Sequence, residues 1–366
     1  MADFPAVATG SPATDPVPGA GRRVLVLAGL TVLAMVLSVL AITPRVVFWK
    51  DYPQMSFETA RVPSLTAQLA DPIHWDQAYL NNPLFGDNAL RWRLLPPVIG
   101  HALRLSPRVY LGLPWLGLIF LVGTSLHYLQ RRGVGPPGLL AAGVLIGTSA
   151  VFFGSSTSIG YFDCLYLLAL VVFCFSPSPL AAVIACLLGP WCDEKFLLML
   201  PACGLLRWSW QPGWRWVGGA ALGVLLYCAA RLSALAGGDS SLRLQLAMQS
   251  KVFSHYASSL PLGWWHGFRL GWIFVAAGLW LAWRQLPRSL GLVLLASLLA
   301  ALVAISFLAW DSTRSIAMLF PFFLVGAAQP RFERSLVWLA VLNILLPAAY
   351  LCCADPVRVP LTSIFH

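Results

Sequence analysis

Three consecutive charged residues, Asp193, Glu194 and Lys195, interrupt an apolar run that extends from Leu180 to Leu206. A lone charge inside a bilayer costs about 2.5–3.5 kcal/mol on insertion scales, so charges kept in such a place usually have partners and a function. Two carboxylates beside an ammonium group can transfer protons, orient cations or bind a phosphate. We therefore take Asp193 and Glu194 as candidate catalytic residues, and Lys195 as a candidate substrate ligand.

A long polar segment, residues 44–107, supplies further acids and arginines. Asp51 and Glu58 are its earliest carboxylates, and Arg91 and Arg93 flank a single tryptophan near its end. Two guanidinium groups this close could clamp a phosphate through paired hydrogen bonds. For either arginine alone, contact with lipid headgroups is the alternative explanation.

The stretch Trp310–Ser315 is a third polar site between apolar runs, and it contains Asp311 and Arg314. A spacing of three residues lets these side chains pair on one helical face, and Asp311 could also cap that helix. Asp163 ends another short polar stretch. A phosphate-binding arginine held by its aspartate is one interpretation of the Asp311–Arg314 spacing, and a capped turn with a local salt bridge is the other.

The composition of the chain indicates which kind of secondary structure positions these residues. The chain has 366 residues, of which 58% are hydrophobic and 10% charged, with a mean hydropathy of +0.75, whereas soluble domains carry roughly 25% charged residues. These values indicate a polytopic membrane protein. The net charge of +10 is spread singly between apolar runs, which favours membrane orientation over nucleic-acid binding.

We predict an all-α membrane helical bundle. Residues 1–21 form a disordered cytoplasmic tail, and residues 22–366 form one transmembrane domain in which 44–107 is the first extracytoplasmic loop with interfacial helices. About eleven transmembrane helices are expected from apolar length. Their predicted ranges are 24–43, 108–129, 138–153, 161–175, 180–189, 196–206, 216–235, 268–283, 289–309, 315–328 and 335–353.

The arginine-rich short turns set the predicted orientation, because Lys and Arg favour the cytoplasmic side. The amino terminus is then cytoplasmic, the carboxyl terminus is extracytoplasmic, and the protein is integral to the inner (plasma) membrane. Segments 180–189 and 196–206 are each only about 15 Å long as helices. Asp193 to Lys195 would therefore lie at an outward hairpin tip, in a hydrated cavity or, alternatively, at a local thinning of the membrane.

The layout resembles the GT-C class of integral membrane glycosyltransferases. The matching features are a first span followed by Trp49-Lys50-Asp51, a long outward loop, and Arg91-Trp-Arg-Leu-Leu-Pro-Pro97 leading into the second span. Many members of the class have two neighbouring acids early in this loop, whereas Asp51 is followed only at Glu58 by another carboxylate. That difference leaves the identity of the base open.

The resemblance implies inverting transfer of a sugar from a polyprenyl-phosphate carrier to a glycan, lipid or protein acceptor at the extracytoplasmic face. Asp51 would accept the proton of the acceptor hydroxyl, and Arg91, Arg93, Lys195 or Arg314 would stabilise the departing phosphate. Asp193 and Glu194 would orient those cations or bind the acceptor. Membrane lipids and the lipid-linked sugar are the expected partners, with no nucleic acid.

Cofactor motifs are absent from the sequence. It contains no Asp-x-Asp, Cys-x-x-Cys or His-containing metal spacing, and no glycine pattern for nucleotides. We therefore expect no metal and no cofactor.

Other function classes stay open. A transporter or lipid flippase could relay protons or cations through Asp193, Glu194 and Asp311. A polymerase or ligase of surface polysaccharide, or a non-catalytic membrane subunit, would also fit the composition.

Overall fold

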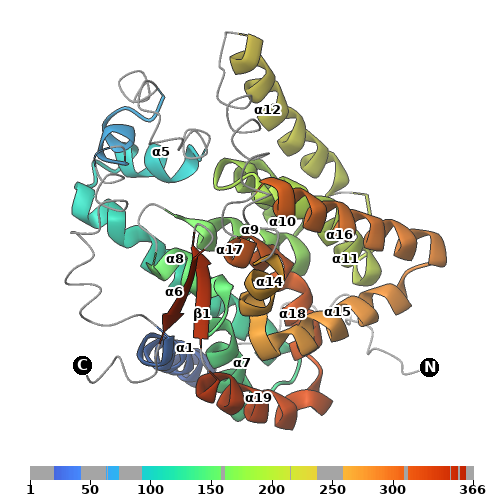
Figure 1. Ribbon diagram of the computed structural model, residues 1–366. Helices are drawn as coiled ribbons and strands as arrows, with labels where there is room; N and C mark the ends of the chain where they lie inside the picture. The colour runs from blue at the N-terminus through green and yellow to red at the C-terminus, as the bar shows by residue number, and fades with distance from the viewer. Residues whose placement is uncertain are drawn as a thin grey trace.

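A computed structural model describes most of the chain, and it is predominantly helical (Figure 1). The predicted helical class is confirmed. The described residues are 20–42, 63, 65–73, 93–157, 161–214, 216–236, 259–308, 312–346, 348–352 and 355–359.

The helices follow the apolar ranges of the sequence closely. Their bounds are α1 (Ala20–Ile42), α5 (Leu95–Ala102), α6 (Pro107–Arg131), α7 (Pro136–Gly147), α8 (Ala150–Thr157), α9 (Asp163–Phe175), α10 (Pro179–Leu188), η3 (Gly189–Trp191), α11 (Lys195–Trp210), α12 (Val217–Ala236), α14 (Leu260–Phe268), η4 (Arg269–Gly271), α15 (Trp272–Gln285), α16 (Arg288–Leu308), α17 (Ser312–Ile316), η5 (Ala317–Leu319), α18 (Phe320–Ala327), η6 (Pro330–Phe332) and α19 (Glu333–Leu345).

Among the described residues, fewer helices could cross a membrane singly than the sequence predicts. Among the described helices, two are long and apolar enough to cross a membrane singly, Pro107–Arg131 and Arg288–Phe307. Two bent pairs would raise the number to four, with bends of 63° between Pro136–Gly147 and Ala150–Ser156 and of 98° between Ser312–Ala327 and Pro330–Leu345. Several other helices are too short for about 30 Å of hydrocarbon. The eleven crossings are therefore not confirmed, and the orientation of the termini is not determined.

The last predicted span, 335–353, is only partly helical. α19 ends at Leu345, and Leu346 is extended with ψ 142°, because the residue before a proline disfavours helical backbone and Pro347 follows. The chain then forms a two-stranded antiparallel ribbon of β1 (Ala348–Cys352) and β2 (Asp355–Val359). The helix predicted over 335–353 therefore ends at Leu345, while the helical class of the fold stands.

Small residues let α1 and α7 approach closely. On α7, a Cβ added at Gly143 would lie 2.5 Å from the Cβ of Ala34, and one at Gly147 would collide with Ser38. Both pairs have a spacing of four residues, which is the small-xxx-small pattern of membrane helix contacts. α19 packs on α7 as well, so these three helices lie together along the lower edge of Figure 1.

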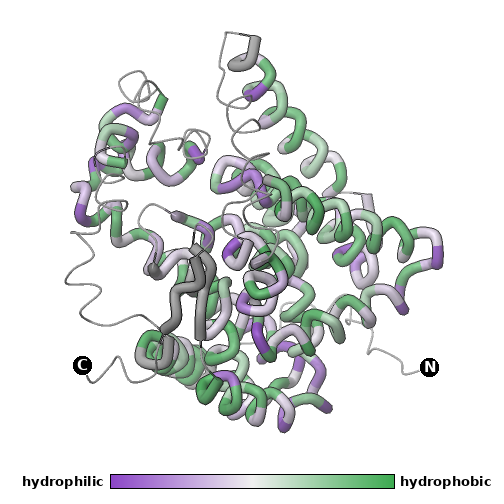
Figure 2. Tube along the Cα trace, in the orientation of Figure 1, coloured by the Kyte–Doolittle hydropathy of each residue, from purple (hydrophilic) through white to green (hydrophobic). Residues whose placement is uncertain are grey.

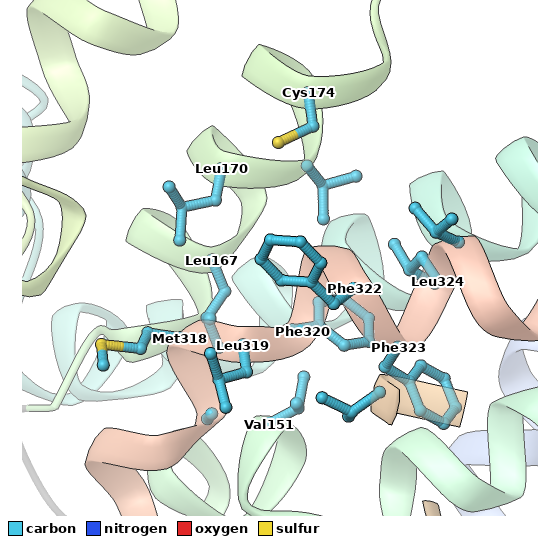
Figure 3. Packing of buried hydrophobic residues seen from close by; sticks show 14 of the residues in the cluster. Val151, Leu167, Leu170, Cys174, Met318, Leu319, Phe320, Phe322, Phe323 and Leu324 are labelled. Atoms are coloured by element: carbon cyan, nitrogen blue, oxygen red, sulfur yellow. The ribbon is translucent and has the colours of Figure 1, made fainter. Parts of the chain in front are cut away.

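The main core is built around α9, which packs against α6, α8, α10, α11 and α18. Figure 3 shows phenylalanines of α18, including Phe320 and Phe322, facing Leu167 and Leu170 of α9 and Val151 of α8. All five of these side chains are buried. In Figure 2 the tube of α12 and α16 is hydrophobic along most of its length, as expected for helices that face lipid. The surrounding helices thus fix α9 in place.

Arg207, which follows the predicted span 196–206, stabilises the end of a neighbouring helix. Its guanidinium is fully buried, and Nη1 donates to the carbonyl oxygens of Phe173 and, at 3.0 Å, of Ser176. These carbonyls belong to the end of α9, where backbone acceptors have no partner within the helix. Arg207 therefore caps α9.

A smaller core attaches the described part of the first long loop to the bundle. We call it the satellite core, and it consists of Leu65, Leu69, Tyr110 and Phe162. Gly100 on α5 permits close approach, because an added Cβ would lie 2.7 Å from Leu69 and 2.8 Å from Tyr110. This packing holds α5 near the beginning of α9. Arg93, two residues before the start of α5, is held there with it.

Candidate functional site

The start of α9 is fixed by a hydrogen bond from α8. The backbone N–H of Cys164 donates to Oγ of Ser155 over 2.8 Å, and both residues are buried. Asp163 is the first residue of α9, where a carboxylate interacts favourably with the positive end of the helix dipole. The side chain of Asp163 is 1% exposed, so this carboxylate needs further partners.

The charged triplet Asp193, Glu194 and Lys195 lies at the start of α11, where Asp193 has a structural role. Oδ1 of Asp193 accepts the backbone N–H of Lys195 over 2.9 Å, and Lys195 is the first residue of α11. Asp193 thus satisfies one of the amide groups that lack a partner within the helix. The other oxygen of its carboxylate is left to bind cations.

Five of the predicted residues form one chain of buried ion pairs. Nη2 of Arg93 lies 2.8 Å from Oδ2 of Asp193, and Nζ of Lys195 lies 3.2 Å from the same oxygen. Nζ of Lys195 is also 3.6 Å from Oδ1 of Asp163, whose Oδ2 lies 3.0 Å from Nε of Arg314. We call this set the ion chain. Along it positive and negative groups alternate, so each carboxylate lies between two cations.

Within the described residues, the ion pairs of this chain contain one more cation than carboxylates, which we call its positive surplus. Its three cations, Arg93, Lys195 and Arg314, face two carboxylates. Nε and Nη1 of Arg93 are buried and make no hydrogen bond with the described residues. A buried guanidinium with unused donors is costly unless a further acceptor binds it. Arg93 is therefore the member best suited to bind an incoming anion.

The pKa values of the first pair follow from burial and charge together. Burial opposes ionisation of Arg93, but Asp193 and then Glu194 outweigh it, so the pKa of Arg93 lies above its ordinary value. Burial likewise opposes ionisation of Asp193, but Arg93 and Lys195 lower the pKa of Asp193 well below the usual range. Asp193 is thus an anion at neutral pH and a poor proton acceptor, which argues for a role in binding or orienting groups rather than in proton transfer.

Glu194 lies beside the ion chain without joining it. Its side chain is half-buried, and its Oε2 makes no hydrogen bond among the described residues. A free carboxylate oxygen can accept a hydrogen bond from the hydroxyl group of a substrate. Of the two acids in the triplet, Glu194 is therefore the better candidate base.

Two tyrosines missed by the sequence analysis flank the ion chain. The ring of Tyr161 has Cζ of Arg314 at 3.5 Å and Cζ of Arg93 at 5.3 Å from its centroid. The ring of Tyr166 has Nζ of Lys195 at 5.4 Å. Their signal in the sequence was their position within three residues of Asp163. Aromatic rings attract cations electrostatically, so each of these tyrosines supports a cation of the chain.

Gly154 is a third feature that spacing alone did not single out. A Cβ at this position of α8 would lie 2.6 Å from Cγ and 2.9 Å from Cδ of Arg314, and 3.0 Å from Oδ2 of Asp163. The absence of a side chain lets the Arg314–Asp163 pair lie directly on α8. Gly154 is therefore required for the geometry of that pair.

The predicted site residues thus divide into two groups. Arg93, Asp163, Asp193, Lys195 and Arg314 lie together, with Glu194 beside them. The remaining four, Asp51, Glu58, Arg91 and Asp311, lie outside the described residues.

Neither metal-binding groups nor comparisons with known proteins assign a function to this site. Within the described ranges, no group of three or more His, Cys, Asp or Glu residues is arranged to hold a metal ion. Comparisons with protein-family models, curated proteins and solved structures find no match to this chain. Functional inference therefore rests on the residues and their geometry.

Proposed function

We propose that the protein is a membrane glycosyltransferase that moves a sugar from a polyprenyl-phosphate carrier to an acceptor at the extracytoplasmic face. The observation that carries the proposal is the ion chain, in which four separate segments contribute buried charges. Apolar helices that could span a membrane would give a lipid carrier access to it. The GT-C-like layout of the sequence points to the same reaction.

The positive surplus of the ion chain suits the leaving group of this reaction. A sugar linked to a lipid monophosphate carries one negative charge, and a second develops on the phosphate as the glycosidic bond breaks. Arg93 has unused donors for that oxygen, while Lys195 and Arg314 are held by their carboxylates. Donors fixed in advance around developing charge can lower a barrier by several kcal/mol.

The displacement itself needs a base, and it involves no oxidation or reduction. The acceptor oxygen attacks the anomeric carbon as its proton passes to a carboxylate, and the bond to the phosphate oxygen breaks with its electron pair. The outcome is inversion at the anomeric carbon. We assign Asp51 as the base, with Glu194 as the alternative because its Oε2 is free of hydrogen bonds.

Release of the carrier tests the proposal. The full chain, purified into lipid nanodiscs, is given a panel of radiolabelled polyprenyl-phosphate sugars and a membrane extract as acceptor. We expect release of polyprenyl phosphate and labelled product, with loss of about a hundredfold or more in turnover for Asp51→Asn and Arg93→Gln. Arg334→Gln, at an exposed position of α19, is the matched control and should keep full turnover. Equal turnover in all four proteins would remove this site from the reaction.

The bent helix pairs favour a second candidate, a transporter or lipid flippase. Breaks of 63° and 98° between apolar helices resemble the interrupted helices around which transporters build their sites. Proteoliposomes distinguish the two functions. Uptake or flipping of substrate that stops when a proton or cation gradient is dissipated, without release of polyprenyl phosphate, would establish transport instead.

A further inference from the structure

The two ends of the ion chain meet at one aromatic ring. Arg93, just before α5, is the first member of the ion chain, and Arg314, on α17, is the last. The two cations therefore come from distant parts of the sequence. Both guanidinium groups approach Tyr161, at 5.3 Å and 3.5 Å from the ring centroid. Tyr161 therefore connects the two ends of the ion chain.

Because both guanidinium groups lie near the same ring, the two arginines repel each other. Arg93 pairs with Asp193 and Arg314 pairs with Asp163, and the repulsion between the arginines still opposes the charge of Arg93. The electron-rich face of an aromatic ring offsets such repulsion, most strongly where water is excluded. Both arginine side chains are largely buried, at 7% and 11% exposure, so the contribution of the ring is at the strong end of its range.

We infer that Tyr161 is a positioning residue that holds Arg93 and Arg314 together so that both can bind one phosphate group. This inference rests on the proposed function for the identity of that phosphate, which belongs to the lipid carrier. Without the ring, the arginines would separate in the unliganded protein. Binding would then have to bring them back, and affinity would fall by the cost of that reorganisation.

The alternative role of Tyr161 is packing. Its ring also lies against the satellite core, next to Phe162, whose ring is tilted by 43° against that of Tyr110 with centroids 5.3 Å apart. A leucine substitution would disturb both roles at once. A test must therefore change the charge distribution of the ring and keep its shape.

Fluorinated rings make that distinction. Tyr161→Phe serves as the reference, and this phenylalanine is then replaced by forms carrying one, two and three fluorine atoms, which progressively weaken the attraction for cations. Binding of a short-chain polyprenyl phosphate to the full chain in nanodiscs is measured by calorimetry. We expect the Kd to rise stepwise, by about tenfold in total. Inorganic phosphate is titrated in parallel, and a much weaker response to it would identify the lipid-linked form as the ligand.

Tyr128 provides the matched control. Cζ of Arg132 lies 5.3 Å from its ring centroid, the same distance as Arg93 from Tyr161, but this pair is near the other end of α6 from the ion chain. The same fluorine series at position 128 weakens a comparable contact and should leave the Kd unchanged.

Each outcome has a definite meaning. A Kd that is flat across the series at position 161, while the reference protein binds and transfers normally, would overturn the positioning role and leave the proposed function intact. A reference protein that transfers sugar but does not bind polyprenyl phosphate would overturn the inference as well. Stepwise weakening in a protein that transfers no sugar would support the arginine pair as a phosphate site and reject the transferase.

Discussion

The substitution Gly154→Ala tests the packing that supports the ion chain. Within a helix, replacing glycine by alanine normally stabilises by up to about 1 kcal/mol, because alanine has less backbone freedom to lose. At Gly154 the added Cβ would lie 2.6 Å from Cγ of Arg314 and 3.0 Å from Oδ2 of Asp163. Cγ of Arg314 is close to that residue's backbone, and Oδ2 of Asp163 is held in the buried ion pair, so neither atom can move aside cheaply. Overpacking of this kind costs about 1–3 kcal/mol.

We therefore expect a net loss of about 1–2 kcal/mol in the free energy of unfolding. Unfolding in mixed detergent micelles measures it. The matched control is Gly112→Ala in α6, where an added Cβ meets nothing within 4 Å; this change should be neutral or stabilising. The same chemical change is thus predicted to have opposite signs at two helical glycines.

A double-mutant cycle identifies the cause of the loss. If the clash with Arg314 is responsible, the cost of Gly154→Ala should shrink when Arg314 is already alanine. An unchanged cost in that background, or a Gly154→Ala protein as stable as the Gly112→Ala protein, would refute the packing argument.

Three further predictions concern buried charges. Asp193→Asn leaves Arg93 and Lys195 without their shared anion and should destabilise by about 3–5 kcal/mol; chemical unfolding at neutral pH measures this, and a change below 1 kcal/mol would contradict the buried pairing. Because the pKa of Asp193 is lowered in the folded protein, its stabilisation is fully present above the ordinary aspartate pKa and is lost only as the pH falls through the lowered value. The stability gap between wild type and Asp193→Asn should therefore be constant from about pH 5 to 8 and narrow only below about pH 4; a gap that closes near pH 6 would be inconsistent with this sign. Arg207→Met removes the cap at the end of α9 and should cost about 1.5–3 kcal/mol per charged hydrogen bond lost, while the Kd for polyprenyl phosphate stays unchanged.

The sequence by itself determined the class of the protein and the membership of much of its site. Apolar length located nearly all of the helices, because hydrophobic runs must be buried in lipid or in a core whatever the fold. The low charge content made each charge inside an apolar run conspicuous, since burial of an unpaired charge is costly. Asp193 and Lys195 could be selected on that ground alone. Asp163 and Arg314 stood out in short polar stretches between apolar runs, and Arg93 stood out by its spacing from Arg91.

Only the tertiary structure decided how those charges pair. The structure pairs Arg314 with Asp163 and Arg93 with Asp193, which are distant in the sequence. The local partner predicted for Arg314, Asp311, lies outside the described residues. The eleven predicted crossings are not confirmed among the described helices, because apolar length does not reveal where a helix bends or ends. The roles of Gly154 and Tyr161 were also hidden, since each depends on what lies opposite in space. Pairing energies fall off over a few ångströms, and these separations arise only when α5, α9, α11 and α17 pack together.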